Sequence, residues 1–104
     1  MYNKLVRDKI PEIIENNGEK PITRVLSEEE YKKELEKKLN EEYQEVLNAC
    51  GDDRIEELAD MLEVMISLAK LDNKGLDDII KAAQKKREKR GGFDKRIYLE
   101  GVNK

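Results

Sequence analysis

The sequence predicts an all-α fold, a small bundle of three to four helices, and two observations carry this prediction. Apolar residues recur at helical spacing over long stretches, and turn-forming residues separate these stretches. Charged residues make up 43% of the 104 residues, but the 38% that are apolar fall within the periodic stretches, which indicates solvated helices and not disorder. The length fits one domain, residues 1–104, and a domain this small buries little surface alone, so oligomerisation is expected.

A short helix is predicted for the opening segment, ending at Asn17-Gly18. Asp8 is placed to cap this helix, and Pro11 is tolerated only near a helix start. The next stretch, residues 20–26, holds a proline followed by β-favouring side chains, and it is predicted to form a short strand.

Two long helices are predicted next. Ser27 and Glu30 make a capping box at the start of a helix that runs roughly from Ser27 to Cys50. The run of residues 51–53, Gly-Asp-Asp, breaks this helix and supplies the cap of the following one. That following helix is apolar on almost every side, so it is predicted to be the most buried of the bundle.

A further helix is predicted after the turn at residues 73–75, and it becomes strongly basic before Gly91-Gly92 stops it. The tail beyond contains the run Ile-Tyr-Leu at residues 97–99, which suggests a short extended segment. This segment is expected to pair with the one near Thr23, giving a two-stranded pairing near the termini.

Composition excludes several classes of function. The net charge of −3 is too balanced to indicate polymeric nucleic acid or an anionic membrane as a partner. Histidine is absent, which excludes a histidine general base, a Ser-His-Asp triad and the usual histidine-bearing zinc sites. Cys50 is the only cysteine, and no signal peptide or membrane-spanning apolar run is present, so a cytoplasmic location is expected.

Two pairs of carboxylates are the strongest candidates for a functional site. Glu42 and Glu45 are three residues apart and so share one face of a helix, as do Glu57 and Asp60. Two helices of a hairpin bring four such carboxylates together, and like charges in contact are unfavourable unless a cation neutralises them. Mg²⁺ is the expected ion, with Mn²⁺ as the alternative, because hard cations take oxygen ligands.

The alternative interpretation is that these residues are ordinary surface acids of a chain that contains 24 acidic residues. Their positions argue against it. Glu42 lies at the edge of the apolar stripe of its helix, and Glu57 and Asp60 project from the side that also carries Val64 and Leu68. Carboxylates that line a partly buried cleft require a metal ion or basic partners.

The run EEYQE at residues 41–45, followed by ELAD at residues 57–60, resembles the EExxE and ExxD motifs of the all-alpha nucleoside triphosphate pyrophosphohydrolases. More specifically the chain looks like a MazG-like protein, a group that includes phosphoribosyl-ATP pyrophosphohydrolase. The opening YNKLVRDKIP at residues 2–11 and the RGGF run at residues 90–93 look like a compact bacterial, archaeal or phage subgroup.

This resemblance implies Mg²⁺-dependent hydrolysis of a nucleoside triphosphate between the α- and β-phosphates, which releases a nucleoside monophosphate and pyrophosphate. It implies that Glu42, Glu45, Glu57 and Asp60 are the catalytic metal ligands, with Glu45 alternatively orienting the attacking water. Glu41 points away from this side of its helix and is expected to lie outside the ligand set. The resemblance also implies a homodimer or a homotetramer built as a dimer of dimers.

Basic residues are expected to bind the phosphates of the substrate. Lys86 and Arg90, four residues apart, match a lysine and an arginine that such proteins carry late in the helix after the acids. A second basic group consists of Lys4, Arg7 and Lys9, and it is expected either to close over the phosphates or to be an ordinary part of the charged surface. The alternative for Lys86 and Arg90 is a solvated helix C-terminus, where cations interact favourably with the helix dipole.

Two other functions stay open at this point. Phosphoribosyl-ATP pyrophosphohydrolase carries out the same chemistry on a different base and sugar, and no residue here specifies either. A non-catalytic helical protein, whose acids solvate an oligomer or hold calcium structurally, belongs to a different class. Metal titration and turnover distinguish the two classes.

Overall fold

The computed structural model describes residues 3–104, so Tyr2, at the start of the N-terminal motif, lies outside the described residues. Within this range the chain forms four α-helices and no strand. The prediction of an all-α fold is confirmed. The helices are α1 (Ile10–Asn16), α2 (Glu28–Asn48), α3 (Gly51–Lys70) and α4 (Leu76–Arg90).

Helix α2 begins at the predicted capping box. The Ser27 hydroxyl accepts a hydrogen bond from the backbone N–H of Glu30 at 3.2 Å, and the Glu30 carboxylate accepts one from the backbone N–H of Ser27 at 3.2 Å. The Arg24 guanidinium donates to the same carboxylate at 2.8 Å. These bonds stabilise the ionised carboxylate and lower the pKa of Glu30 to about 2. The start of α2 is therefore fixed by residues close together in the sequence.

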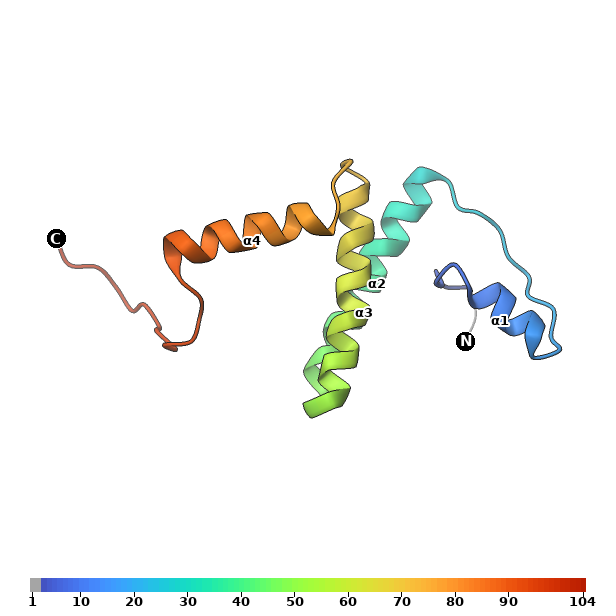
Figure 1. The fold of residues 1–104 in the computed structure, drawn as a ribbon, viewed down its shortest axis with the longest axis horizontal. Coiled ribbons are helices and arrows are strands. Elements are labelled where there is room, and N and C mark those ends of the chain that lie inside the picture. Colours follow the sequence, from blue (N-terminus) through green and yellow to red (C-terminus); the bar gives the residue numbers. More distant parts are fainter. Residues whose placement is uncertain (1–2) are drawn as a thin grey trace.

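Helices α2 and α3 form an antiparallel hairpin and lie side by side (Figure 1). The chain reverses at Ala49 and Cys50, both of which are extended. The buried core of the described residues consists of Leu35 from α2, 3% exposed, and Val64 from α3, 8% exposed. Helix α3 has the largest share of partly buried residues, but its enclosed part is continuous only over residues 64–69.

The predicted pairing of two short strands is wrong. Residues 20–26 form a linker without strand structure, and residues 97–99 lie in an exposed C-terminal tail. Figure 1 shows the two segments at opposite sides of the molecule, because α4 carries the tail away from the hairpin. A strand requires a neighbour for its backbone hydrogen bonds, and β-favouring side chains alone do not supply one.

Two predicted helix caps are also wrong. Asp8 does not cap α1, whose N-cap is Lys9, and no side chain bonds to the helix start there. Helix α3 begins at Gly51 with Cys50 as its N-cap, which makes Asp52 and Asp53 part of the first turn. Acidic side chains in that turn interact favourably with the positive end of the helix dipole without capping it.

The chain is strongly elongated. Its radius of gyration is 18.3 Å, whereas a compact chain of this length has one of about 13 Å. Helix α4 extends away from the hairpin, and α1 lies on the other side of it (Figure 1). Sixteen large apolar side chains are exposed among the described residues, from Tyr43 and Leu47 on α2 to Phe93 in the tail. None of the helices in residues 3–104 has the length and apolar character needed to cross a membrane.

Candidate metal centre

Three of the four predicted carboxylates meet in the hairpin, on the halves of α2 and α3 that are nearer the turn. Glu42 comes from α2, Glu57 and Asp60 come from α3, and one oxygen from each lies within 4.8 Å of the others. The three-residue spacing places Glu57 and Asp60 on one face of α3, and the antiparallel packing brings the Glu42 side of α2 against that face. All three residues are half-buried. We call these three residues the carboxylate triad.

Electrostatics in the triad disfavours the ionised forms of Glu42 and Glu57. The pKa of Glu42 is raised, first by partial burial and then by the charge of Asp60, while Lys38 acts in the opposite direction. The pKa of Glu57 is raised by loss of hydration and by the charges of Glu45 and Asp60. A cation among the oxygens would remove this repulsion.

The donor set fits a hard divalent cation. It consists of carboxylate oxygens only, the ligands that Mg²⁺ and Mn²⁺ prefer. Glu45 lies outside the triad and is exposed, although its charge raises the pKa of Glu57. Its role as a fourth ligand stays a prediction. Glu41 is exposed and lies outside the triad, as expected from its position on the helix, and its carboxylate is 3.7 Å from the Lys38 ammonium.

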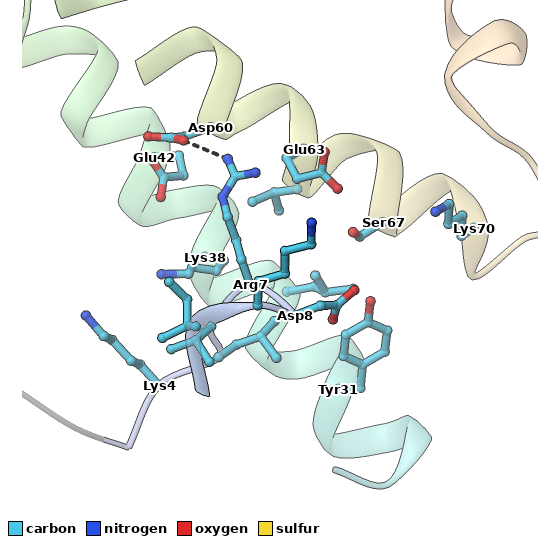
Figure 2. A pocket seen from close by; sticks show the side chains of 16 residues that line it. Lys4, Arg7, Asp8, Tyr31, Lys38, Glu42, Asp60, Glu63, Ser67 and Lys70 are labelled. Atoms are coloured by element: carbon cyan, nitrogen blue, oxygen red, sulfur yellow. Dashed lines mark hydrogen bonds and ion pairs between the residues drawn. The ribbon is translucent and has the colours of Figure 1, made fainter. Parts of the chain in front are cut away.

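An open cavity of about 700 Å³ adjoins the triad, and Glu42 and Asp60 form part of its wall. Residues 4–10 line one side of it, and the facing surfaces of α2 and α3 line the other (Figure 2). The helices contribute buried Leu35 and Val64 together with polar side chains. The cavity therefore combines an apolar floor with cations and carboxylates at its margin.

The structure separates the two predicted groups of phosphate-binding residues. Lys4 and Arg7 line the cavity, and the Arg7 guanidinium forms an ion pair with Asp60, with 2.7 Å between Nη2 and Oδ1 (Figure 2). Lys86 and Arg90 do not line it. They lie toward the outer end of α4, which runs away from the hairpin (Figure 1). Within one chain, only the N-terminal pair accompanies the triad.

Sequence reasoning missed several residues of the cavity wall. Each continues a helical face on which a predicted residue lies: Lys38 is four positions before Glu42, and Glu63 is three after Asp60. Extending both faces by helical periodicity finds them. The missed residues on the two helices that carry polar groups are Tyr31, Lys38, Glu63, Ser67 and Lys70.

Comparison with described protein families and with solved structures finds no match. A curated protein of Mycolicibacterium smegmatis, described only as uncharacterized, is 49% identical to the chain over 43 residues. The matched part covers 41% of this chain and 44% of that protein. The chain thus aligns with less than half the length of this relative, and the comparison assigns no activity to either protein.

The raised pKa values predict how the metal-free protein responds to pH. A carboxyl group whose pKa is higher in the folded state binds a proton more tightly there, so its contribution to stability is present below the unfolded value of about 4.5 and lost as the pH rises. With a chelator present, we expect the melting temperature of the wild type to fall relative to that of Glu57→Gln between pH 4.5 and neutrality.

Thermal unfolding of both proteins, followed by circular dichroism at each pH, measures the difference between their melting temperatures. Groups that lie away from the triad, such as Glu30, titrate in the same way in both proteins and so do not change this difference. Bound Mg²⁺ favours the ionised carboxylates, so its addition is expected to reverse the trend for the wild type only. If the melting temperature of the metal-free wild type rose relative to that of Glu57→Gln as the pH increased, the proposed repulsion between the carboxylates would be contradicted.

Proposed function

We propose that the protein is a Mg²⁺-dependent nucleoside triphosphate pyrophosphohydrolase of the MazG-like type, which cleaves between the α- and β-phosphates and releases a nucleoside monophosphate and pyrophosphate. The observation that supports this most is that the carboxylate triad borders a cavity whose wall also carries Lys4, Arg7, Lys9 and Lys38. Carboxylates alone suit a structural cation. Carboxylates facing several lysines and an arginine suit a metal ion that shares a phosphate ligand with the protein.

The positions of the residues suggest separate roles in metal binding and in phosphate binding. We assign Glu42, Glu57 and Asp60 to holding the metal, and Glu45 to completing its ligands or orienting the attacking water. When bound, Mg²⁺ would polarise the α-phosphate and lower the pKa of the attacking water molecule, which replaces the histidine general base that this sequence lacks. We also assign to Lys4 and Lys38, which line the cavity, the neutralisation of phosphate oxygens that the metal leaves free.

The cavity also suggests an orientation for the nucleotide. Figure 2 shows Asp60 and Glu42 at one end of the cavity and the Tyr31 ring toward the other. Phosphates belong beside the carboxylates and cations, so we place the base toward Tyr31, whose aromatic face is suited to stacking on it. Stacking on an aromatic ring tolerates every base, so this contact does not select one nucleotide.

We further propose that the working form is a homodimer or a homotetramer. The elongated shape and the exposed apolar residues of the hairpin, including Tyr43, Leu47 and Ile55, support a second copy that covers this face. Lys86 and Arg90 lie on a helix that leaves its own hairpin. In an assembly these cations are available to the phosphates held by a partner.

Leu47→Glu tests the assembly. Leu47 is 57% exposed on α2, so the substitution does not disturb the buried core of one chain but places a charge in the proposed interface. We expect sedimentation equilibrium to show dimers or tetramers for the wild type and a dissociation constant raised about tenfold or more for the variant. Val102→Glu, in the exposed tail, is the matched control. A monomeric wild type would contradict the proposal.

The activity itself is tested with a panel of nucleoside triphosphates, phosphoribosyl-ATP included, incubated with Mg²⁺ or with a chelator. We expect Mg²⁺-dependent release of pyrophosphate from at least one nucleotide. Preferential turnover of phosphoribosyl-ATP would assign the biosynthetic substrate. Metal binding without turnover of any member of the panel would instead identify a structural metal site and contradict the proposed function.

A further inference from the structure

The Arg7–Asp60 ion pair differs in its sequence separation from the other side-chain hydrogen bonds and ion pairs of residues 3–104. It joins residues 53 positions apart, whereas the others join residues within the same stretch of chain, such as Arg24 with Glu30 or Arg87 with Asp94. Helix α1 makes no close backbone packing with the hairpin. Polar attachment of the N-terminal segment, residues 3–9, to the hairpin therefore depends on this pair.

The partner of Arg7 is a member of the carboxylate triad. The guanidinium nitrogen lies 2.7 Å from Asp60 Oδ1, and Asp60 also contributes an oxygen to the group with Glu42 and Glu57. Figure 2 shows the Arg7 side chain reaching from the N-terminal segment to this carboxylate, with Glu42 beside it. The Arg7 guanidinium is therefore paired with a carboxylate that a divalent ion would use as a ligand.

We infer that Arg7 is an internal counter-ion that competes with the metal for Asp60 and, when metal displaces it, binds the phosphates of the nucleotide. The inference rests on the proposed function and adds to it an order of events. When the metal binds Asp60, the Arg7 side chain separates from this carboxylate. The phosphates of the nucleotide then bind the Arg7 guanidinium, which holds residues 3–9 over the cavity. Arg7 is then a residue that couples metal occupancy to closure of the site.

The strength of the pair suits such an exchange. The Arg7 and Asp60 side chains are 57% and 45% exposed, so solvent screens their attraction and little is lost on separation. A divalent ion offers twice the charge of a guanidinium to the same oxygen. Beside a bound triphosphate, a guanidinium forms two parallel hydrogen bonds to phosphate oxygens. Together these are stronger than its single contact with an exposed carboxylate oxygen.

Separation of the Arg7 side chain from Asp60 is also expected to affect helix α1, which begins shortly after Arg7. The first residue of that helix, Ile10, donates its backbone N–H to the carbonyl oxygen of Arg7 at 3.0 Å. Release of the Arg7 side chain therefore removes the tether directly before α1. We expect metal alone to speed amide hydrogen exchange in residues 10–16 of the wild type, and metal with a non-hydrolysable nucleotide to slow it again.

The decisive test is calorimetric titration of wild type and Arg7→Gln with two probes. With Mn²⁺ alone, the variant is expected to bind about two- to fivefold more tightly, because a competitor for Asp60 is gone. With α,β-methylene ATP in saturating Mg²⁺, it is expected to bind about tenfold more weakly, because a phosphate ligand is gone. Lys20→Gln, an exposed charge of the same sign after α1, is the control for net charge and is expected to change neither affinity.

The opposite signs separate this inference from a purely structural role, which would weaken both affinities together. Unchanged or weaker Mn²⁺ binding by Arg7→Gln, with binding abolished in Asp60→Asn, would overturn the inference and leave the metal centre standing. Failure of the wild type to bind Mn²⁺ would overturn the proposed function and the inference with it. Hydrogen exchange in the wild type that does not respond to metal would also overturn it, independently of any variant.

Discussion

Glu57→Gln is expected to slow pyrophosphate release about a hundredfold or more, because the substitution removes a charged ligand from the carboxylate triad. The amide keeps the size of the side chain but binds Mg²⁺ poorly, and the loss of one carboxylate leaves the remaining oxygens a weaker donor set. Rates at saturating nucleotide and several Mg²⁺ concentrations measure the effect. Asp60→Asn is expected to behave in the same way.

Glu56→Gln is the matched control, since Glu56 is the exposed neighbour of Glu57 and lies outside the triad. Its rate is expected to stay within about twofold of the wild type, because an exposed charge in water acts weakly at a distance. Without metal, Glu57→Gln is expected to be at least as stable as the wild type, since it relieves repulsion. Equal rates for Glu57→Gln and Glu56→Gln would show that the triad takes no part in catalysis.

Leu35→Ala is expected to lower the free energy of unfolding by about 2–5 kcal/mol. Leu35 is 3% exposed and is one of the two buried apolar side chains of residues 3–104, so little other buried core remains after its truncation. Urea unfolding followed by circular dichroism measures the change. Protein concentration must be held constant, because any assembly adds to the apparent stability.

Val25→Ala provides the comparison for this core variant. Val25 is 97% exposed in the linker before α2, so its truncation is expected to change the free energy of unfolding by no more than about 0.5 kcal/mol. A small effect of Leu35→Ala, similar to that of Val25→Ala, would mean that the α2–α3 contact does not hold the hairpin together.

The fold was predictable where it depends on residues close together in the sequence. The capping box of Ser27 and Glu30 fixes the start of α2, and Gly91, with a φ of +83°, ends α4. The strand prediction failed because strand formation depends on a partner segment, and residues 20–26 have none. The caps predicted at Asp8 and at residues 52–53 failed because capping depends on how the chain enters the helix, not on residue type alone.

The candidate site was predictable to a similar degree and for a similar reason. Helical spacing places Glu57 and Asp60 on one face, and a tight hairpin brings Glu42 to them. The rotation of α2 about its axis decides that Glu42 rather than Glu45 completes the triad, and spacing alone does not fix it. The pairing of Arg7 with Asp60 spans 53 positions and depends on the path of the N-terminal segment, which no local pattern encodes.

Cleavage between the α- and β-phosphates is tested most directly by hydrolysis of a nucleoside triphosphate with Mg²⁺ in ¹⁸O-labelled water, followed by ³¹P NMR of the products. We expect a nucleoside monophosphate that carries the label on its phosphate group, together with unlabelled pyrophosphate, because water attacks the α-phosphate. Label in the pyrophosphate, or a nucleoside diphosphate with orthophosphate as products, would contradict it.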